Sequence, residues 1–142
     1  MHRVLAVLSL PATCAEVPLH AAAIEGVLPP PYRGELVRIG LVEALMNAIV
    51  HGAFGVETST DFDAYLDAIQ AAESEGRRQV RCTVRASESQ CEVVIADEGR
   101  GFDWRTVPTT RGHGLSILRE VFADVRWNSA GNELSLSLKR AS

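Results

Sequence analysis

The sequence predicts an α/β protein, built as a two-layer sandwich in which helices cover one face of a sheet. The helical pattern is strongest over residues 36–50, LVRIGLVEALMNAIV, an apolar run long enough for about four turns. The strand pattern comes from residues 79–87 and 91–97, where apolar and polar residues alternate as in half-buried antiparallel strands. Helices and strands within one short chain are expected to share one core.

Length and composition indicate one globular domain over residues 1–142, because 46% hydrophobic and 23% charged residues are ordinary for a packed chain. The net charge of −4 argues against direct nucleic-acid binding, since phosphate contacts need clustered Lys and Arg. The apolar stretch at residues 4–10 is too short to cross a bilayer, so we expect no membrane association.

The expected elements follow one another with clear boundary signals. The prolines from Pro29 stop the preceding helix, and Glu35 suits the positive end of the next helix dipole. The expected order is a strand at 4–10, helices at 12–28 and 36–50, a short helix capped by Thr60 or Asp61, strands at 79–87 and 91–97, a helix from 116 and two strands joined around 129–132.

The three cysteines, Cys14, Cys82 and Cys91, have no metal-ligand spacing. Cys82 and Cys91 fall on the two strands of the predicted hairpin, where they could face one another. We interpret them as small core residues that stay reduced.

Glu43, Asn47 and His51 form a polar stripe on the apolar helix. Positions four apart advance only about 40° around a helix axis, so the three side chains share one face. A buried carboxylate or amide is costly unless it is hydrogen-bonded, paired or coordinating an ion. This helix alone leaves two interpretations open: a binding face, or polar core groups satisfied by backbone, with His51 and Gly52 forming an ordinary helix end.

Two glycine-containing turns follow. Asp97 ends a buried strand and precedes Gly99 and Gly101, in a turn whose backbone can approach a ligand closely. Gly112 and Gly114 open the next helix, where N–H groups and the helix dipole favour phosphate. Each turn taken alone is also ordinary loop chemistry.

Together, E-x-x-x-N-A-x-x-H-G on a helix, D-x-G-x-G-F after a strand and G-x-G-L at a helix start resemble the N, G1 and G2 boxes of the GHKL ATPase superfamily. The segments EALMNAIVHGA and DEGRGFDW look most similar to the bacterial anti-sigma-factor serine kinases. The resemblance covers nearly the whole chain. It implies the Bergerat fold of histidine-kinase-like ATPases, with a mixed, largely antiparallel sheet, and ATP bound between the striped helix and a lid.

The resemblance implies a role for each matching residue. Asn47 would ligate the Mg²⁺ that bridges the nucleotide phosphates, and Glu43 would act as the general base. Asp97 would accept a hydrogen bond from the adenine amino group. For His51 we favour a packing or capping role. The glycines of the base pocket and lid, the phosphate donors and their neighbours would be Gly99, Gly101, Thr109, Thr110, Arg111, Gly112, Gly114 and Leu115.

The implied function is that of an Mg-ATP-dependent serine/threonine protein kinase and anti-sigma factor. It would phosphorylate a STAS-domain anti-sigma-factor antagonist and sequester a sigma factor by partner switching. A cytoplasmic location and a homodimer are expected on the same ground. Two alternatives stay open: a non-catalytic nucleotide-binding module that sequesters a partner, and the separated catalytic domain of a histidine kinase. Autophosphorylation within the chain is not expected, because His20 lacks the context of a phosphoaccepting histidine.

Two segments depart from the family pattern. The lid between Gly101 and Gly112 holds only ten residues, so we expect modest nucleotide affinity or a partner that completes the site. Residues 54–78 are longer than the family usually carries between the helix and the next strand. They predict an insertion on the outside of the domain, which could serve as a partner or oligomer contact or be a solvated surface elaboration.

Overall fold

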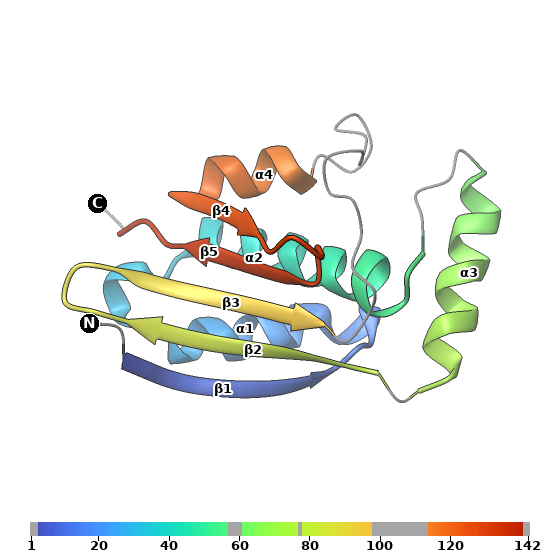
Figure 1. Ribbon diagram of the computed structural model, residues 1–142, viewed down its shortest axis with the longest axis horizontal. Helices are drawn as coiled ribbons and strands as arrows, with labels where there is room; N and C mark the ends of the chain where they lie inside the picture. Colours follow the sequence, from blue (N-terminus) through green and yellow to red (C-terminus); the bar gives the residue numbers. More distant parts are fainter. Residues whose placement is uncertain (1–2, 57–60, 77, 98–113, 141–142) are drawn as a thin grey trace.

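A sheet and a layer of helices make up the fold of the computed structural model (Figure 1), which describes residues 3–56, 61–76, 78–97 and 114–140. The elements in chain order are β1 (Arg3–Pro11), the short 3-10 helix η1 (Cys14–Glu16), α1 (Val17–Val27), the 3-10 helix η2 (Pro30–Tyr32), α2 (Glu35–Asn47), the π-helix η3 (Ala48–Ala53), α3 (Phe62–Ser74), β2 (Gln79–Ala86), β3 (Cys91–Asp97), α4 (Gly114–Val121), β4 (Asp124–Trp127) and β5 (Glu133–Ser137).

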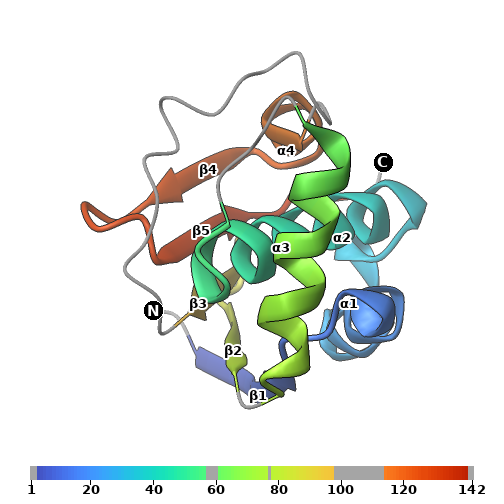
Figure 2. The ribbon, with the colours of Figure 1, turned by 90° about the vertical axis from the view of Figure 1, so that its right-hand side faces the viewer.

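The sheet has five strands in the order β1-β2-β3-β5-β4. Each of its four described pairings is antiparallel, so the described strands include no parallel pair. Seen from the side, α1, α2 and α4 all lie on the same side of the sheet (Figure 2). The predicted two-layer α/β sandwich is therefore confirmed.

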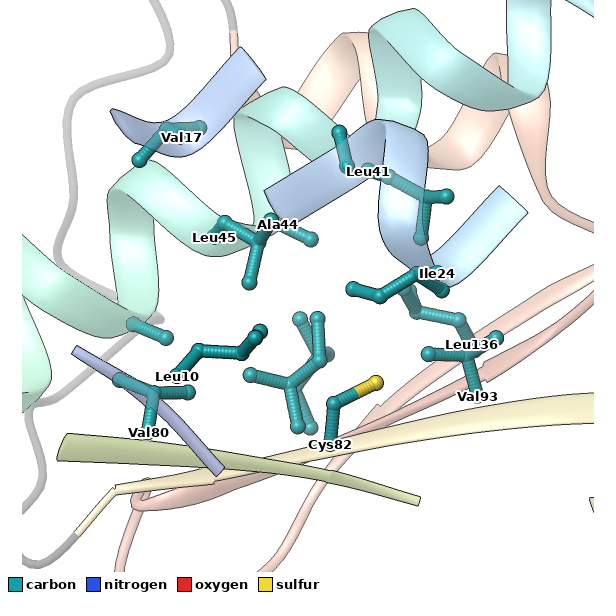
Figure 3. Packing of buried hydrophobic residues seen from close by; sticks show 14 of the residues in the cluster. Leu10, Val17, Ile24, Leu41, Ala44, Leu45, Val80, Cys82, Val93 and Leu136 are labelled. Carbon is teal, nitrogen blue, oxygen red and sulfur yellow. The ribbon is translucent and has the colours of Figure 1, made fainter. Parts of the chain in front are cut away.

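The core fills the space between the two layers. The alternating residues Val80, Cys82 and Val84 of β2 are fully buried, as their pattern predicted. Figure 3 shows that Leu41 and Leu45 of α2 extend into the same cluster from the helix layer. Side chains from both layers therefore close over one another in a single apolar core.

The helix α2 together with η3 is the most central helical segment of the domain. Residues Glu35–Ala53 are long and apolar enough to cross a membrane, with a mean hydropathy of 1.4 over the best window, but 56% of that window is buried inside the fold. Gly40 allows α4 to pack closely, since a Cβ atom there would lie 2.8 Å from Cε2 of Phe122. The apolar composition of this segment thus serves as core-forming surface.

The expected short helix between the central helix and β2 is present as α3, and it lies on the outside of the domain. That residues 54–78 are an insertion stays a prediction. Asp61 caps α3, because its Oδ1 accepts a hydrogen bond of 3.1 Å from the N–H of Ala64. No described residue of α3 is buried, and Phe62 is 61% exposed. Figure 1 shows α3 at one end of the two layers. Its contribution to binding a partner or a second copy stays a prediction.

The expected end of the central helix at His51 and Gly52 is wrong. The chain continues through the π-helix η3 to Ala53, where Phe54 N–H donates to the carbonyl of Ile49 over 2.8 Å. Gly52 is buried within this segment instead of terminating it. A π-helix bonds residue i to i+5, and nothing in the apolar pattern distinguishes it from an α-helix.

The two hairpin cysteines do not face one another. The strand register places Cys82 opposite Ile95 and Cys91 opposite Ala86. Burial raises the pKa of Cys82 to about 12 and that of Cys91 to about 11. Both thiols therefore remain protonated at neutral pH, which agrees with their interpretation as core residues.

We predict that Phe122→Ala destabilises the domain by about 3–5 kcal/mol, because it leaves a cavity where α4 packs on Gly40 of α2. The matched control Phe62→Ala removes the same side chain from the exposed face of α3 and should change stability by about 0.5 kcal/mol or less. Urea unfolding followed by circular dichroism measures both values. Equal losses would contradict the described packing of the two helices.

Candidate functional site

The end of α2 and the end of β3 meet at one hollow of the surface. Asn47 is the last residue of α2, and Asp97 is the last residue of β3. Both line the hollow together with the connection between β4 and β5. Its described lining residues are Asn47, Ala48, Ile95, Asp97, Trp127, Gly131, Asn132, Glu133 and Leu134. The two residues on which the sequence prediction most depends are thus brought together from distant parts of the chain.

The carboxylate of Asp97 lies against the π-helix. A Cβ atom placed on Gly52 would be 2.1 Å from Oδ2 of Asp97 and 2.6 Å from its Cγ, distances that no real Cβ atom tolerates. The backbone of Asp97 is fixed on its other side, since its N–H donates to the carbonyl of Asn132 over 2.9 Å. Position 52 must therefore be glycine if the carboxylate is to keep this place.

Glu43 lies one helical turn before Asn47 and is half-buried. It is not among the described residues that line the hollow. Burial raises the pKa of its carboxyl group, because the charged form loses hydration. A carboxylate with a raised pKa is a stronger base, which is the property that proton abstraction from a hydroxyl group requires.

The side chain of His51 contacts the backbone just after η3. Its Nδ1 lies 2.7 Å from the carbonyl oxygen of Val56, so Nδ1 carries the proton and donates. This bond fixes the chain where it leaves η3. His51 also lies beyond the point where α-helical spacing gives way to π-helical spacing, so the polar stripe does not extend regularly from Asn47 to His51. The bond to Val56 agrees with the packing or capping role that we favoured for His51, and that role stays a prediction.

The remaining predicted site residues belong to the two glycine-containing turns. Gly114 and Leu115 lie in the first turn of α4. The other six lie outside the described residues, and their roles stay predictions: Gly99, Gly101, Thr109, Thr110, Arg111 and Gly112.

The lining of the hollow combines apolar surface with polar groups. Ile95, Trp127 and Leu134 offer apolar surface, and Asp97 offers a hydrogen-bond acceptor beside it. The amide oxygen of Asn47 suits a hard cation such as Mg²⁺. The described residues contain no group of three or more His, Cys, Asp or Glu side chains that could hold a metal.

Sequence reasoning missed the contributions of Gly52, Trp127 and Asn132. Gly52 was interpreted as part of a helix end, and its closeness to Asp97 depends on how a helix lies against a strand. Trp127 and Asn132 were assigned only to a terminal pair of strands. The Asn and Gly residues of the segment NSAGN do signal a tight turn, but they carry no information about which other element this turn approaches.

Comparison with known proteins identifies the fold and its ligand class. A family model for the histidine kinase-like ATPase domain matches residues 7–138. No curated protein matches the chain. The family match covers β1 from Val7 onward and the whole of β2, β3, β4 and β5, and it includes both Asn47 and Asp97. It confirms the GHKL resemblance, whereas the anti-sigma-factor kinase family stays a prediction. The chain therefore belongs to the family of histidine kinase-like ATPase domains, whose GHKL-type fold binds ATP.

Proposed function

We propose that the protein is an Mg-ATP-dependent serine/threonine protein kinase that phosphorylates a STAS-domain anti-sigma-factor antagonist. In the same partner-switching system it would act as an anti-sigma factor in the cytoplasm. The observation that best supports a nucleotide-dependent activity is the meeting of Asn47 and Asp97 at one hollow. The choice of a serine or threonine acceptor is supported by the motif resemblance and by the half-buried Glu43, which offers a base close to Asn47.

Three side chains would each have one role in the phosphoryl transfer. The carboxylate of Asp97 would accept a hydrogen bond from the amino group of adenine, and the amide oxygen of Asn47 would hold Mg²⁺, which would supply charge neutralisation for the phosphates. Glu43 would accept the proton of the attacking hydroxyl group, whose oxygen would bond to the γ-phosphorus as the bond to ADP breaks and ADP leaves. Catalysis in phosphoryl transfer is mostly positioning and charge stabilisation, so a domain of this size can supply it with few groups.

The decisive experiment mixes the protein, labelled ATP, Mg²⁺ and a STAS-domain protein encoded close to its gene. We expect label on a serine or threonine of the STAS protein. We expect Glu43→Gln to lower the transfer rate by about 10²–10⁴-fold while nucleotide binding is retained. Glu35→Gln, in the exposed first turn of the same helix, is the matched control and should leave transfer unchanged.

The other outcomes of this experiment each identify a different function. A tight complex without transfer would contradict the kinase and indicate a sequestering module. Transfer to a histidine of another chain would indicate the separated catalytic domain of a histidine kinase. Full activity of Glu43→Gln would show that Glu43 is not the base.

The raised pKa of Glu43 predicts a pH-dependent gain of stability in Glu43→Gln. The folded state binds the proton of Glu43 more tightly than the unfolded state, so wild-type stability falls as pH rises from the unfolded-state pKa through the raised folded-state pKa. Gln carries no titratable group and avoids this loss. Urea unfolding should therefore show the variant more stable than the wild type at pH 7, with a smaller difference at pH 4. A pH-independent difference would contradict the burial effect.

We predict that Gly52→Ala weakens ATP binding by about tenfold or more, because the added methyl group displaces the carboxylate of Asp97. Gly26→Ala is the matched control, since a Cβ atom at Gly26 meets nothing within 4 Å. Isothermal titration calorimetry with ATP measures both variants. Unchanged affinity in a folded Gly52→Ala variant would show that the carboxylate of Asp97 does not contribute to nucleotide binding.

A further inference from the structure

The helix α3 carries an apolar stripe that the domain covers over only part of its length. Ile69 and Ala72, in its second half, are half-buried and pack against the core. Phe62 and Leu66, in its first half, continue the same side of the helix, because residues three, four and seven apart share one face. These two side chains belong to residues that are 61% and 40% exposed. They form an apolar surface that no layer of the described residues covers.

Carboxylates border this apolar surface. Residues 61–76 contain no Lys or Arg, and their acidic residues are Asp61, Asp63, Asp67, Glu73 and Glu75. Asp63 and Asp67 are exposed and directly follow Phe62 and Leu66 in the sequence. Neither of these two carboxylates forms an ion pair with another described residue. The exposed half of α3 is therefore both apolar and negatively charged.

The charge of α3 decides which kind of partner fits it. Nucleic acids and anionic membrane surfaces are excluded, because helices that bind them carry Lys and Arg on their polar side. A second copy of α3 would bring like charges together. A protein surface with an apolar patch bordered by basic side chains matches both the apolar residues and the carboxylates.

The position of α3 relates this surface to the candidate site. Figure 1 shows α3 at the end of the domain at which α2 with η3 and β3 also end. Nη1 of Arg78, just after α3, donates to the carbonyl oxygen of Ala53, the last residue of η3. Nη2 of the same guanidinium donates to Oε2 of Glu75 over 3.1 Å. Arg78 thus joins the C-terminal end of α3 to the segment that places Gly52 beside Asp97.

We propose that Phe62, Leu66, Asp63 and Asp67 form a docking surface for the protein substrate, which meets it with an apolar patch bordered by Lys and Arg. The inference rests on the proposed kinase function and adds a substrate contact outside the hollow, in the segment between η3 and β2. Docking raises the local concentration of the acceptor hydroxyl group and leaves the chemical step unchanged. The surface therefore contributes to the KM for the protein substrate and not to kcat.

The first test compares steady-state kinetics of the full chain with the STAS-domain protein of the transfer assay, at saturating ATP. The double variant Phe62→Ala, Leu66→Ala removes the apolar surface and keeps good helix formers. We expect its KM for the STAS protein to rise about tenfold or more, with kcat and the KM for ATP unchanged. Leu36→Ala is the matched control, because Leu36 is 68% exposed at the other end of the central helix, and it should keep all three values.

The second test changes charge alone. The double variant Asp63→Asn, Asp67→Asn keeps the shape of both side chains and removes their charges. Raising NaCl from about 0.05 M to about 0.5 M should raise the wild-type KM for the STAS protein, because salt screens the attraction, and should raise it less in this variant. Glu35→Gln, in the exposed first turn of α2, is the matched control and should retain the wild-type salt dependence.

The outcomes separate the docking surface from the function beneath it. Wild-type protein that transfers label, with unchanged kinetics in both folded double variants, overturns the docking surface and leaves the kinase intact. Wild-type protein that transfers no label overturns the kinase. Calorimetry of the STAS protein with the chain and ADP then tests the surface by itself: weaker binding by Phe62→Ala, Leu66→Ala supports it, whereas equal binding or no binding overturns it. Loss of a dimer in this variant, measured by light scattering, would assign the surface to a second copy and overturn the substrate.

Discussion

Among the glycines whose surroundings the structure describes, Gly52 has the shortest approach, made by the carboxylate of Asp97. This contact joins the last residue of the central strand to the last turns of the central helix, with no space for even one methyl group between them. The helix layer must therefore lie at one particular distance from the sheet. The apolar contacts of the whole core hold it there. The packing of the helix layer and the position of the Asp97 carboxylate at the hollow therefore depend on the same contact.

The site is assembled from the ends of three elements. Asn47 stands where α-helical bonding ceases, Asp97 where β3 ceases, and Asn132 in the turn that leads into β5. Element ends carry backbone groups without regular partners, and side chains such as Asn128 satisfy them here. A buried apolar core lies between the layers behind these ends.

Much of the fold was predictable because the local alternation of apolar and polar residues indicates which side chains are buried. The alternation of Val80, Cys82 and Val84 records which face of β2 meets the helices, and the order of the three boxes located Asn47 and Asp97. What escaped prediction depends on the registration of distant segments. The contact of Gly52 with Asp97, the offset of Cys82 from Cys91 and the place of Asn132 at the hollow all require knowing how one element lies against another.

The number of residues in the π-helix η3 is itself a structural constraint. Between Asn47 and Ala53 the chain holds more residues per turn than an α-helix would, and this spacing delivers Gly52 to Asp97. Loss of one residue here would restore α-helical spacing and rotate everything after it by about 100° around the axis. An insertion or deletion inside this segment would therefore move Gly52 away from Asp97 at the strand end even if every side chain were kept.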